Sequence, residues 1–290
     1  MHEANATNWD ANPTSIYCCR RTVKLKTKVF GSIIIPVFNQ LEYTKKCLDS
    51  LLRDTDRPPY EIIVIENGSS DGTREYLEQK SRDLEGSQDW LIPIFNETNH
   101  GVAIAWNQGL VTASGKFIAV LNNDIVLTNG WFRSLLWSIE HHRLALVSGF
   151  AETGDLNYDL EQRAIKFVKK NLHKIWLHEY DFSNIVLLRS TYEHVGPFDE
   201  NFHVGGYEDT DYCYRLRAQN LRFGVSGAAF IHHYGSKTLN EFKQQGDKHV
   251  THNREYFYSK WKEDPSVKAC SFVKKLTRAA RRWKLNLDWM

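Results

Sequence analysis

A short polar cluster, Asn122-Asn123-Asp124, interrupts the apolar stretch Phe117-Ile-Ala-Val-Leu-Asn-Asn-Asp-Ile-Val126. An apolar run of this length is typical of a strand that is buried on both faces. A carboxylate that follows such a strand lies at the carboxyl edge of a parallel sheet, where open α/β sheets bind their ligands. Asn and Asp also favour ordinary turns. Taken alone, the cluster therefore leaves a ligand site and a plain turn equally open.

Polar side chains also follow the earlier apolar runs of the chain. The residues found directly after the expected strands are Asn39, Glu66 with Asn67, Asn99 and Asp124. The carboxyl ends of parallel strands meet at one edge of a sheet, so four polar tips favour one shared site over four unrelated turns.

The elements that must position these residues alternate along the chain. Strands are predicted at 29–37, 60–65, 90–95 and 116–121. Helices are predicted at 41–52, 73–84 and 103–110. This alternation predicts a parallel sheet with helical crossovers. The later chain predicts a helix at 131–142, a short helix and a turn within 189–199, and a helix through Tyr212, Leu216 and Ala218 that a Gly-hinged loop opens. Strands are predicted at 145–150, 181–188, 221–225 and 228–232, with a weaker, more charged pattern between 151 and 180.

Bulk composition excludes several classes of protein. The chain has 290 residues, is 42% hydrophobic and 25% charged, and carries a formal net charge of +2, so no nucleic-acid partner is indicated. No apolar run approaches the length of a membrane span. Residues 1–12 lack an apolar signal core, and the 5 cysteines are scattered. These features predict a cytoplasmic protein with reduced thiols.

Four ordered segments resemble the family-2 glycosyltransferases of the GT-A fold, especially bacterial rhamnosyl- and polysaccharide-chain transferases. The matching segments are Ile34-Ile-Pro-Val-Phe-Asn39, Val64-Ile-Glu-Asn-Gly-Ser-Ser-Asp-Gly-Thr73, Asn99-His-Gly-Val-Ala-Ile-Ala-Trp-Asn-Gln-Gly109 with Val120-Leu-Asn-Asn-Asp124, and Gly205-Gly-Tyr-Glu-Asp-Thr-Asp211 followed by His233. The resemblance implies an α/β fold with a Rossmann-like, mostly parallel central sheet and helices on both faces. It covers roughly residues 30 to 240.

We divide the chain into an N-terminal extension at 1–28, a GT-A domain at 29–250 and a C-terminal helical, basic, amphipathic tail at 251–290. Within the domain we expect a nucleotide half at 29–126 and an acceptor half at 127–250.

The tail pattern points to a helix with one apolar face. Phe272, Leu276, Trp283 and Leu287 share that face, and Lys and Arg residues surround it. Such a helix could lie on an anionic membrane surface, which would place the protein peripherally at the inner face of the membrane. A helix that packs on the domain and solvates its lysines is an equal alternative.

The resemblance also implies the donor site. Four residues would form the nucleobase and ribose pocket, Glu66 would accept a hydrogen bond from the base, and Asn107 would lie near the ribose and diphosphate. The two asparagines before Asp124 would position the nucleotide-sugar. The complete predicted donor set is Pro36, Val37, Phe38, Asn39, Glu66, Asn67, Asn107, Asn122 and Asn123.

A metal site is implied next to the diphosphate. Asp124 stands where the family carries its acidic metal motif, and a histidine after the last strand often completes the site. We expect that histidine to be His233, with His232 as the alternative. Oxygen ligands suit Mn²⁺ or Mg²⁺, and a divalent cation neutralises the charge that develops on the leaving diphosphate.

Two adjacent acids are the implied catalytic residues. Asp209 would be the general base for the acceptor hydroxyl, and Glu208 would orient the acceptor or substitute as the base. A carboxylate in this role contributes about 10²–10⁴-fold to the rate. Both residues could instead be first-turn acids that stabilise a helix N-terminus.

The resulting hypothesis is an inverting, metal-assisted hexosyl- or deoxyhexosyltransferase. It would move a sugar from a UDP- or dTDP-linked donor to a hydroxyl of a glycan or lipid-linked acceptor by a single displacement. One alternative is a catalytically weak, glycan-binding domain that resembles a transferase. A less favoured alternative is a sugar-nucleotide nucleotidyltransferase. The latter needs a Gly-rich, basic loop after the first strand, and the segment Pro36-Val-Phe-Asn-Gln-Leu-Glu42 has no such residues.

Overall fold

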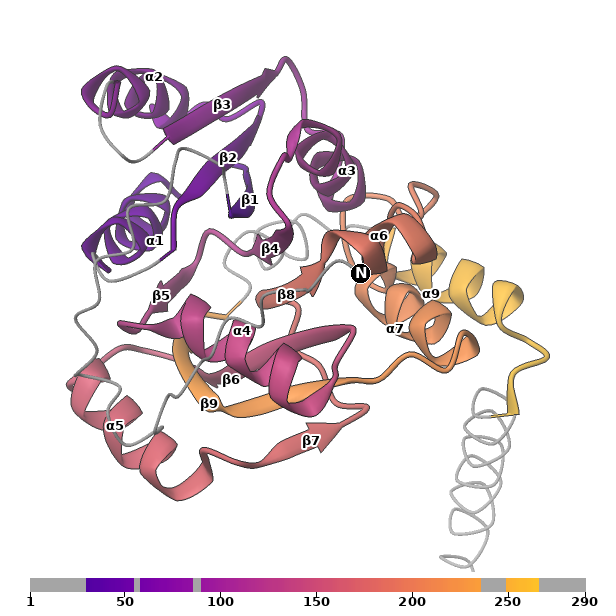
Figure 1. Cartoon of the computed structure of the whole chain (residues 1–290). Helices are drawn as coiled ribbons and strands as arrows, with labels where there is room; N and C mark the ends of the chain where they lie inside the picture. Colours follow the sequence, from indigo (N-terminus) through magenta and orange to yellow (C-terminus); the bar gives the residue numbers. More distant parts are fainter. Residues whose placement is uncertain (1–29, 55–57, 86–89, 236–248, 266–290) are drawn as a thin grey trace, which may run out of the picture.

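The computed structural model describes residues 30–54, 58–85, 90–235 and 249–265. Within these residues the chain forms one nine-stranded sheet with helices on both of its faces (Figure 1). The expected extension at 1–28 and the amphipathic face that begins at Phe272 lie outside the described residues. No helix in the described ranges has the length and apolar character needed to cross a membrane.

The first half of the fold is a regular parallel sheet. Its elements are β1 (Gly31–Val37), α1 (Leu41–Arg53), β2 (Tyr60–Asn67), α2 (Thr73–Asp83), β3 (Trp90–Asn96), α3 (Val102–Thr112) and β4 (Phe117–Leu121). The strands lie in the order β3-β2-β1-β4, and every pair is parallel. Pairing of β1 with β4 stops at Ile34, so Pro36 near the end of β1 interrupts no ladder on that side.

The second half continues the same sheet with mixed strand directions. Its elements are β5 (Ile125–Leu127), α4 (Trp131–His142), β6 (Leu146–Thr153), α5 (Leu160–Asn171), β7 (Ile175–Leu177), β8 (Asn184–Leu188), α6 (Arg189–Val195), α7 (Glu208–Ala218), β9 (Phe223–His233) and α9 (His249–Lys260). The sheet order continues β4-β8-β6-β9-β5, and β7 also pairs with β9. Only β8, β5 and β7 run antiparallel to their neighbours, and the other six strands share one direction. The prediction of a mostly parallel α/β sheet is confirmed.

Three features of the second half differ from the sequence-based expectation. The strands expected at 221–225 and 228–232 are one strand, β9, with an irregularity opposite Gly149 and Phe150. The segment 151–180 contains α5 and β7, which the pattern did not predict. In α5 Leu160 and Ala164 are buried four positions apart, which is a helical spacing, and charged residues occupy much of the rest of the helix. The expected boundary at 250 falls inside α9.

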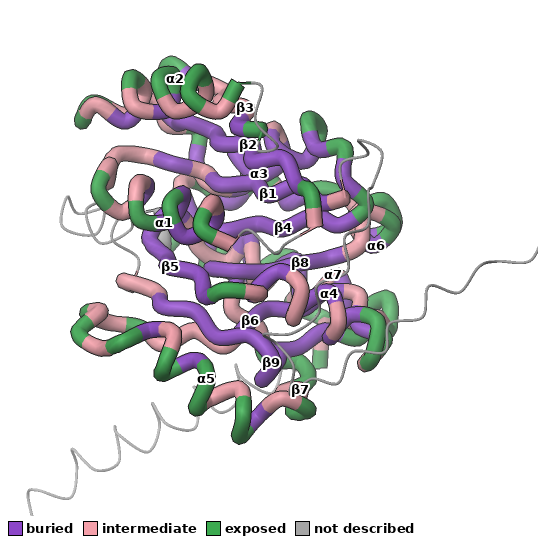
Figure 2. The backbone as a smooth tube through the Cα atoms, turned by 60° about the vertical axis from the view of Figure 1, so that its left-hand side comes forward, coloured by how far each residue is buried: buried purple, intermediate pink, exposed green. Residues whose placement is uncertain are grey.

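Two hydrophobic layers hold the helices on the sheet. Alternate residues of β1 face opposite sides, because side chains along a strand alternate. Ile33 and Ile35 pack in the layer with α1, α2 and α4. Ile34 packs in the layer with α3 and α7. Figure 2 shows the buried strands in the centre and the exposed residues on the outer surfaces of the helices.

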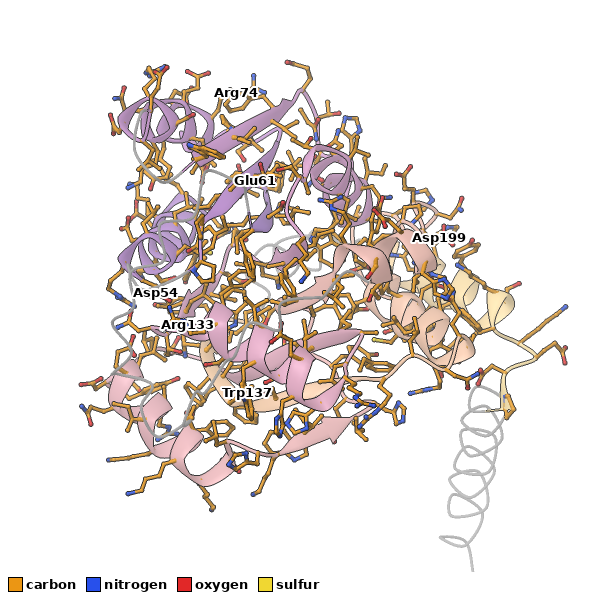
Figure 3. The ribbon with its side chains drawn as sticks, viewed as in Figure 1. Asp54, Glu61, Arg74, Arg133, Trp137 and Asp199 are labelled. Atoms are coloured by element: carbon orange, nitrogen blue, oxygen red, sulfur yellow. The ribbon has the colours of Figure 1, made fainter. Side chains whose placement is uncertain are left out.

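A buried carboxylate fixes the end of the sheet opposite the polar strand tips. Glu61 of β2 lies within the sheet and is 5% exposed (Figure 3). Its Oε1 accepts hydrogen bonds from Ser32 Oγ at 2.6 Å and from the Ser114 amide at 2.6 Å. These bonds tie β1 and β2 to the connection between α3 and β4. The sheet is thereby anchored at one end, and its other end carries the site residues.

Candidate active site

A cavity with a volume of about 410 Å³ opens at the carboxyl ends of β1, β2 and β4. This is the edge at which open α/β sheets bind their ligands. Segments from both halves of the chain form its wall: 36–38, Asn67, 99–106, 122–124, 180–183, 204–209 and His233.

Ten of the fourteen residues expected at the site line this cavity. They are Pro36, Val37, Phe38, Asn67, Asn122, Asn123, Asp124, Glu208, Asp209 and His233. The other four, which are absent from the lining, are Asn39, Glu66, Asn107 and His232.

Asn39 and Glu66 hold the turn that borders the cavity. The backbone amide of Asn39 donates to Ser69 Oγ at 2.8 Å, and its Oδ1 accepts from the Ser70 amide at 2.9 Å. Glu66 is fully buried. Its Oε1 accepts from the Ser69 amide, and its Oε2 accepts from Arg74 Nε at 3.2 Å. The carboxylate that was expected to meet the base thus holds the chain that follows β2.

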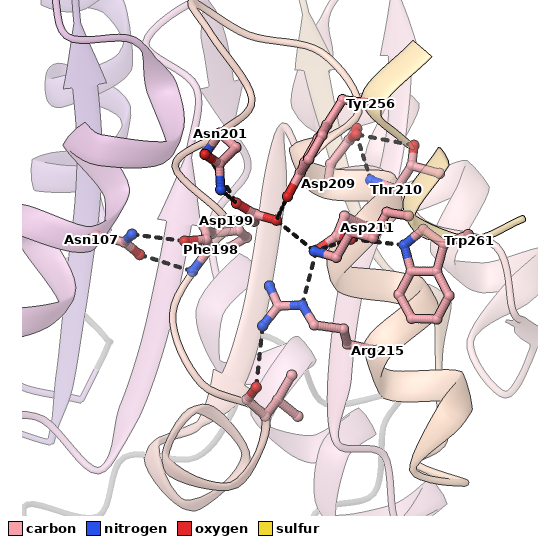
Figure 4. A network of polar contacts seen from close by, with 12 residues as sticks. Asn107, Phe198, Asp199, Asn201, Asp209, Thr210, Asp211, Arg215, Tyr256 and Trp261 are labelled. Carbon is pink, nitrogen blue, oxygen red and sulfur yellow. Dashed lines mark hydrogen bonds and ion pairs between the residues drawn. The ribbon is translucent and has the colours of Figure 1, made fainter. Parts of the chain in front are cut away.

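Asn107 joins the two halves of the molecule (Figure 4). Its Nδ2 donates to the Phe198 carbonyl at 2.9 Å and to Glu200 Oε1 at 2.8 Å, and its Oδ1 accepts from the Phe198 amide at 2.9 Å. These hydrogen bonds occupy both ends of the Asn107 side-chain amide, and Asn107 is not among the residues that line the cavity. Its expected position near the ribose stays a prediction.

In the nucleotide half, hydrogen bonds between neighbouring Asn side chains fix the residues at the ends of the strands. Asn67 Nδ2 donates to Asn99 Oδ1 at 2.9 Å, and Asn96 Nδ2 donates to Asn67 Oδ1 at 2.9 Å. Asn99 Oδ1 also accepts from the Gly101 amide at 2.9 Å, at the start of α3. This network sets the positions of Asn67 and Asn99 on the cavity wall.

Asp124 and His233 meet at the cavity because β5 pairs with β9. In that antiparallel pair Ile125 lies opposite His233, so Asp124 is brought beside the imidazole. His233 Nε2 lies 3.2 Å from Asp124 Oδ1, and within the described ranges this buried nitrogen has no well-aligned hydrogen-bond partner. Burial opposes protonation, but the Asp124 carboxylate raises the pKa of His233 above its ordinary value. The pair is a candidate metal-binding pair.

His232 faces the other side of β9. It is 1% exposed, and its Nδ1 lies 2.8 Å from the Tyr158 hydroxyl. Because adjacent residues of a strand point to opposite faces, only one of the two histidines can face the cavity. The structure places His233 there.

The two acids begin α7 and reach the cavity from the acceptor half. Glu208 is 5% exposed, and its Oε2 has no hydrogen-bond partner in the part of the chain that the structure describes. Burial, and then the charge of Asp209, raise the pKa of Glu208 to about 8. Burial also raises the pKa of Asp209, whose Oδ1 accepts from the Thr210 amide at 2.6 Å. Both carboxyl groups therefore hold protons more strongly than exposed acids.

Asp181 is a lining carboxylate that the sequence analysis did not select. Its Oδ1 accepts from the Ser183 amide at 2.9 Å, and its own amide donates to Ser148 Oγ at 3.1 Å. The strand that follows it, β8, is antiparallel to β4 and pairs Asn184 with Leu121. The amino end of β8 therefore lies at the edge where β4 ends. In the sequence, Asp181 precedes its apolar run, whereas the other acids and amides of the strand ends follow theirs.

Acidic groups dominate the charge of the cavity. Among the described residues of its wall, the groups that can carry charge near neutral pH are the imidazole of His233 and four carboxylates: Asp124, Asp181, Glu208 and Asp209. A diphosphate placed against carboxylates is repelled unless a cation lies between them. An aspartate oxygen and an imidazole nitrogen are suitable ligands for Mn²⁺, and Mg²⁺ needs few protein ligands when phosphates contribute. Within the described residues, no group of three or more His, Cys, Asp or Glu side chains forms a complete metal site.

Sequence comparison identifies the family. Residues 32–220 match the family described as Glycosyl transferase family 2. Glycosyltransferase AglE of Haloferax volcanii is 30% identical over 191 residues, which cover 62% of this chain and 59% of that protein. Validoxylamine A glucosyltransferase of Streptomyces hygroscopicus is 26% identical over 229 residues, which cover 67% and 49%. The matches thus span less than two thirds of either relative.

Solved structures support the fold. GalNAc-T7, solved with UDP, GalNAc and Mn²⁺, superposes with a TM-score of 0.58 at 14% identity and covers 82% of this chain and 51% of that one. Residues 1–349 of S. aureus TarS superpose with a TM-score of 0.54 at 17% identity and cover 80% and 72%. The chain has the GT-A fold, and it belongs to glycosyltransferase family 2.

Proposed function

We propose that the protein is an inverting glycosyltransferase that uses a nucleotide-diphosphate sugar and a divalent metal ion. The observation that carries this proposal is the convergence of three groups on one cavity. The strand tips of the nucleotide half, the pair Asp124 and His233, and the acids Glu208 and Asp209 all line it.

The donor is a UDP- or dTDP-linked sugar. Pro36, Val37 and Phe38 at the end of β1 provide an apolar wall for the nucleobase, and Asn67 provides polar atoms beside it. The similar structure of GalNAc-T7 was solved with UDP and Mn²⁺, which supports a uridine nucleotide as the first candidate.

Asp124 and His233 hold Mn²⁺ or Mg²⁺ beside the diphosphate. The distance of 3.2 Å between His233 Nε2 and Asp124 Oδ1 allows both atoms to bind one ion. When bound, the ion supplies charge neutralisation for the leaving diphosphate. Asn122 and Asn123 border the same position. Asn122 orients the nucleotide-sugar through its uncharged amide, whereas Asn123 Nδ2 donates to Thr44 Oγ1 at 3.1 Å and fixes this turn on α1.

Asp209 is the general base. Its raised pKa makes it a better proton acceptor than an ordinary carboxylate once it is ionised. It removes the proton of the acceptor hydroxyl as that oxygen attacks the anomeric carbon, and the bond to the nucleoside diphosphate breaks in the same step with inversion. Glu208 orients the acceptor, and Asp181 accepts hydrogen bonds from sugar hydroxyls. The acceptor is a hydroxyl of a glycan or of a lipid-linked sugar.

A nucleotide panel tests this proposal. UDP, dTDP, GDP and ADP are added with and without Mn²⁺, and the melting temperature is measured. A nucleotide at about 100 times its Kd stabilises the folded state by about 2.7 kcal/mol, which raises Tm by about 5 °C or more. We expect UDP or dTDP to do so only with the metal, and the corresponding nucleotide-sugar to be consumed. No stabilisation by any nucleotide would refute the proposal, and glycan binding without nucleotide binding would indicate a binding domain.

A further inference from the structure

The loop before the catalytic acids has an unusual backbone. Val204 has φ of 56°, Gly206 of 101° and Tyr207 of 77°. The left-handed region is sparsely populated by residues other than Gly, and least of all by β-branched residues such as Val. Such a backbone persists only where surrounding contacts determine it. Glu208 and Asp209 follow this loop directly, so its shape sets where both carboxyl groups point.

One side chain from α9 accounts for much of that constraint. Asn253 is 0% exposed and uses both ends of its amide on the loop. Its Oδ1 accepts from the His203 amide at 2.9 Å. Its Nδ2 donates to the carbonyls of His203 at 2.8 Å, Gly205 at 3.2 Å and Gly206 at 3.0 Å. Four backbone groups of the loop are thus held by a residue about 50 positions later in the chain.

Independent contacts fix α9 itself against α7. Lys260 Nζ lies 2.8 Å from Asp211 Oδ1, which also accepts from Trp261 Nε1 at 2.8 Å (Figure 4). Tyr256 donates its hydroxyl proton to Asp199 Oδ2 at 2.9 Å. The Phe257 ring lies 5.4 Å from that of Tyr207 in the loop. Asn253 is therefore presented by a docked helix that does not depend on its own hydrogen bonds.

We propose that Asn253 is a positioning residue, which holds the loop from His203 to Tyr207 so that Glu208 and Asp209 face the cavity. The assignment rests on the proposed transfer reaction. Asn253 lies outside residues 32–220, the part of the chain that matches the family. The acceptor half is thus completed by a residue beyond that match.

Two substitutions with a matched control test this role. Asn253→Ala removes all four hydrogen bonds. Asn253→Asp keeps the size of the side chain but places acceptor oxygens against three carbonyls. Tyr256→Phe, on the same helix, removes one hydrogen bond to Asp199 and none to the loop. The Asp variant provides a second test if the Ala variant does not fold.

We expect the two Asn253 variants to lower kcat by about 10²-fold, because small displacements of catalytic groups have effects of this size. The affinity for UDP or dTDP with Mn²⁺ should stay within about a factor of two, and Tyr256→Phe should retain kcat within the same factor. The proposal would be overturned if kcat and nucleotide affinity fell together in proportion to the loss of stability, and if Tyr256→Phe caused the same losses.

A double-mutant cycle with Val204→Gly separates positioning from simple stability. Gly adopts positive φ readily, so the loop in that background needs less external constraint. We expect Asn253→Ala to reduce kcat several-fold less in the Val204→Gly background than in the wild type. Equal fold losses in both backgrounds would contradict the positioning role.

Hydrogen exchange provides a readout that does not depend on activity. The His203 amide donates to Asn253 Oδ1, so its exchange should accelerate about tenfold or more in Asn253→Ala while amides of β1 and β2 remain unchanged. Unchanged exchange at 203–207 would refute the bracing by Asn253. A wild-type protein that transfers no sugar but shows this local acceleration would refute only the proposed function.

Discussion

The two halves of the molecule position their site residues in different ways. In the nucleotide half, Asn67 is the last residue of β2, Asn99 follows the neighbouring parallel strand β3, and the two side chains are hydrogen-bonded to each other. In the acceptor half, Glu208 and Asp209 follow a loop with positive φ angles, which is held by Asn253 from α9. The first arrangement results from regular strand pairing. The second arrangement depends on contacts from α9, which is far from the loop in the sequence.

This difference suggests a division of work. A regular sheet edge is suited to holding a nucleotide of fixed shape. The geometry of that edge is set by the hydrogen bonds between paired strands, so one strand cannot shift without its neighbours. A loop braced by a separate helix can change without disturbing the sheet, which suits recognition of an acceptor.

Removing the proposed general base should slow transfer strongly. Asp209→Asn keeps the size of the side chain, and its Oδ1 can still accept from the Thr210 amide. Because a general base contributes about 10²–10⁴-fold, we expect kcat to fall by that amount. The rate of nucleoside diphosphate release in the presence of acceptor measures it. Transfer at the wild-type rate would show that another group is the base.

Truncating the sheet core should destabilise the whole domain. Ile34 is 0% exposed and packs between β1 and α3, so Ile34→Ala should cost about 2–5 kcal/mol of unfolding free energy, measured by urea denaturation. Val111 on α3 is 83% exposed, and Val111→Ala should change stability by less than about 0.5 kcal/mol. Equal effects of the two substitutions would mean that this layer is not the core.

The buried acid of the acceptor half should make stability depend on pH. The unfolded chain ionises Glu208 near its ordinary pKa of 4.5, while the folded protein keeps the proton up to about pH 8. The contribution of Glu208 to the free energy of unfolding should therefore be largest below pH 4.5 and decrease up to about pH 8, by at most about 1.4 kcal/mol per pH unit. Glu208→Gln should flatten this dependence in metal-free buffer. If the pH dependence of the unfolding free energy were unchanged in Glu208→Gln, another group would be responsible for it.

Loosening α9 should have a small effect on stability. Lys260→Met removes a cation that lies 2.8 Å from Asp211 Oδ1 and 2.6 Å from Asp199 Oδ2, but Asp211 keeps Arg215 Nε at 2.9 Å. We expect a loss of about 1 kcal/mol in urea denaturation. Faster exchange at 203–207 should accompany it, because the helix carries Asn253. A loss as large as that of Ile34→Ala would mean that α9 is part of the main core.

Much of the nucleotide half could be predicted because its signals are local. The residues that follow β1, β2 and β4 come directly after buried apolar runs, and a parallel sheet brings such positions to one edge. Local rules do not give the direction of a side chain within a turn. Glu66 and Asn39 are next to the cavity in sequence, but their side chains turn back to the chain around Ser69 and Ser70.

The acceptor half was less predictable because its geometry depends on distant pairing. Asp181 precedes its strand, and only the antiparallel direction of β8 brings it to the cavity. The choice between His232 and His233 depends on the register of β9 with β5. Asn253 is an ordinary polar residue in the sequence, and its role follows only from the fold of the loop around it.

The nucleotide affinity of two matched variants tests the central claim most directly. Asp124→Asn and Asp209→Asn make the same chemical change at two residues of the cavity wall, one from each half of the chain. We expect Asp124→Asn to weaken binding of UDP or dTDP with Mn²⁺ by about tenfold or more, as EDTA should in the wild type, because a metal ligand is lost. Asp209→Asn should stay within about a factor of two. Equal losses in both variants, or binding that is insensitive to EDTA, would contradict the division between a metal-dependent donor half and a catalytic acceptor half.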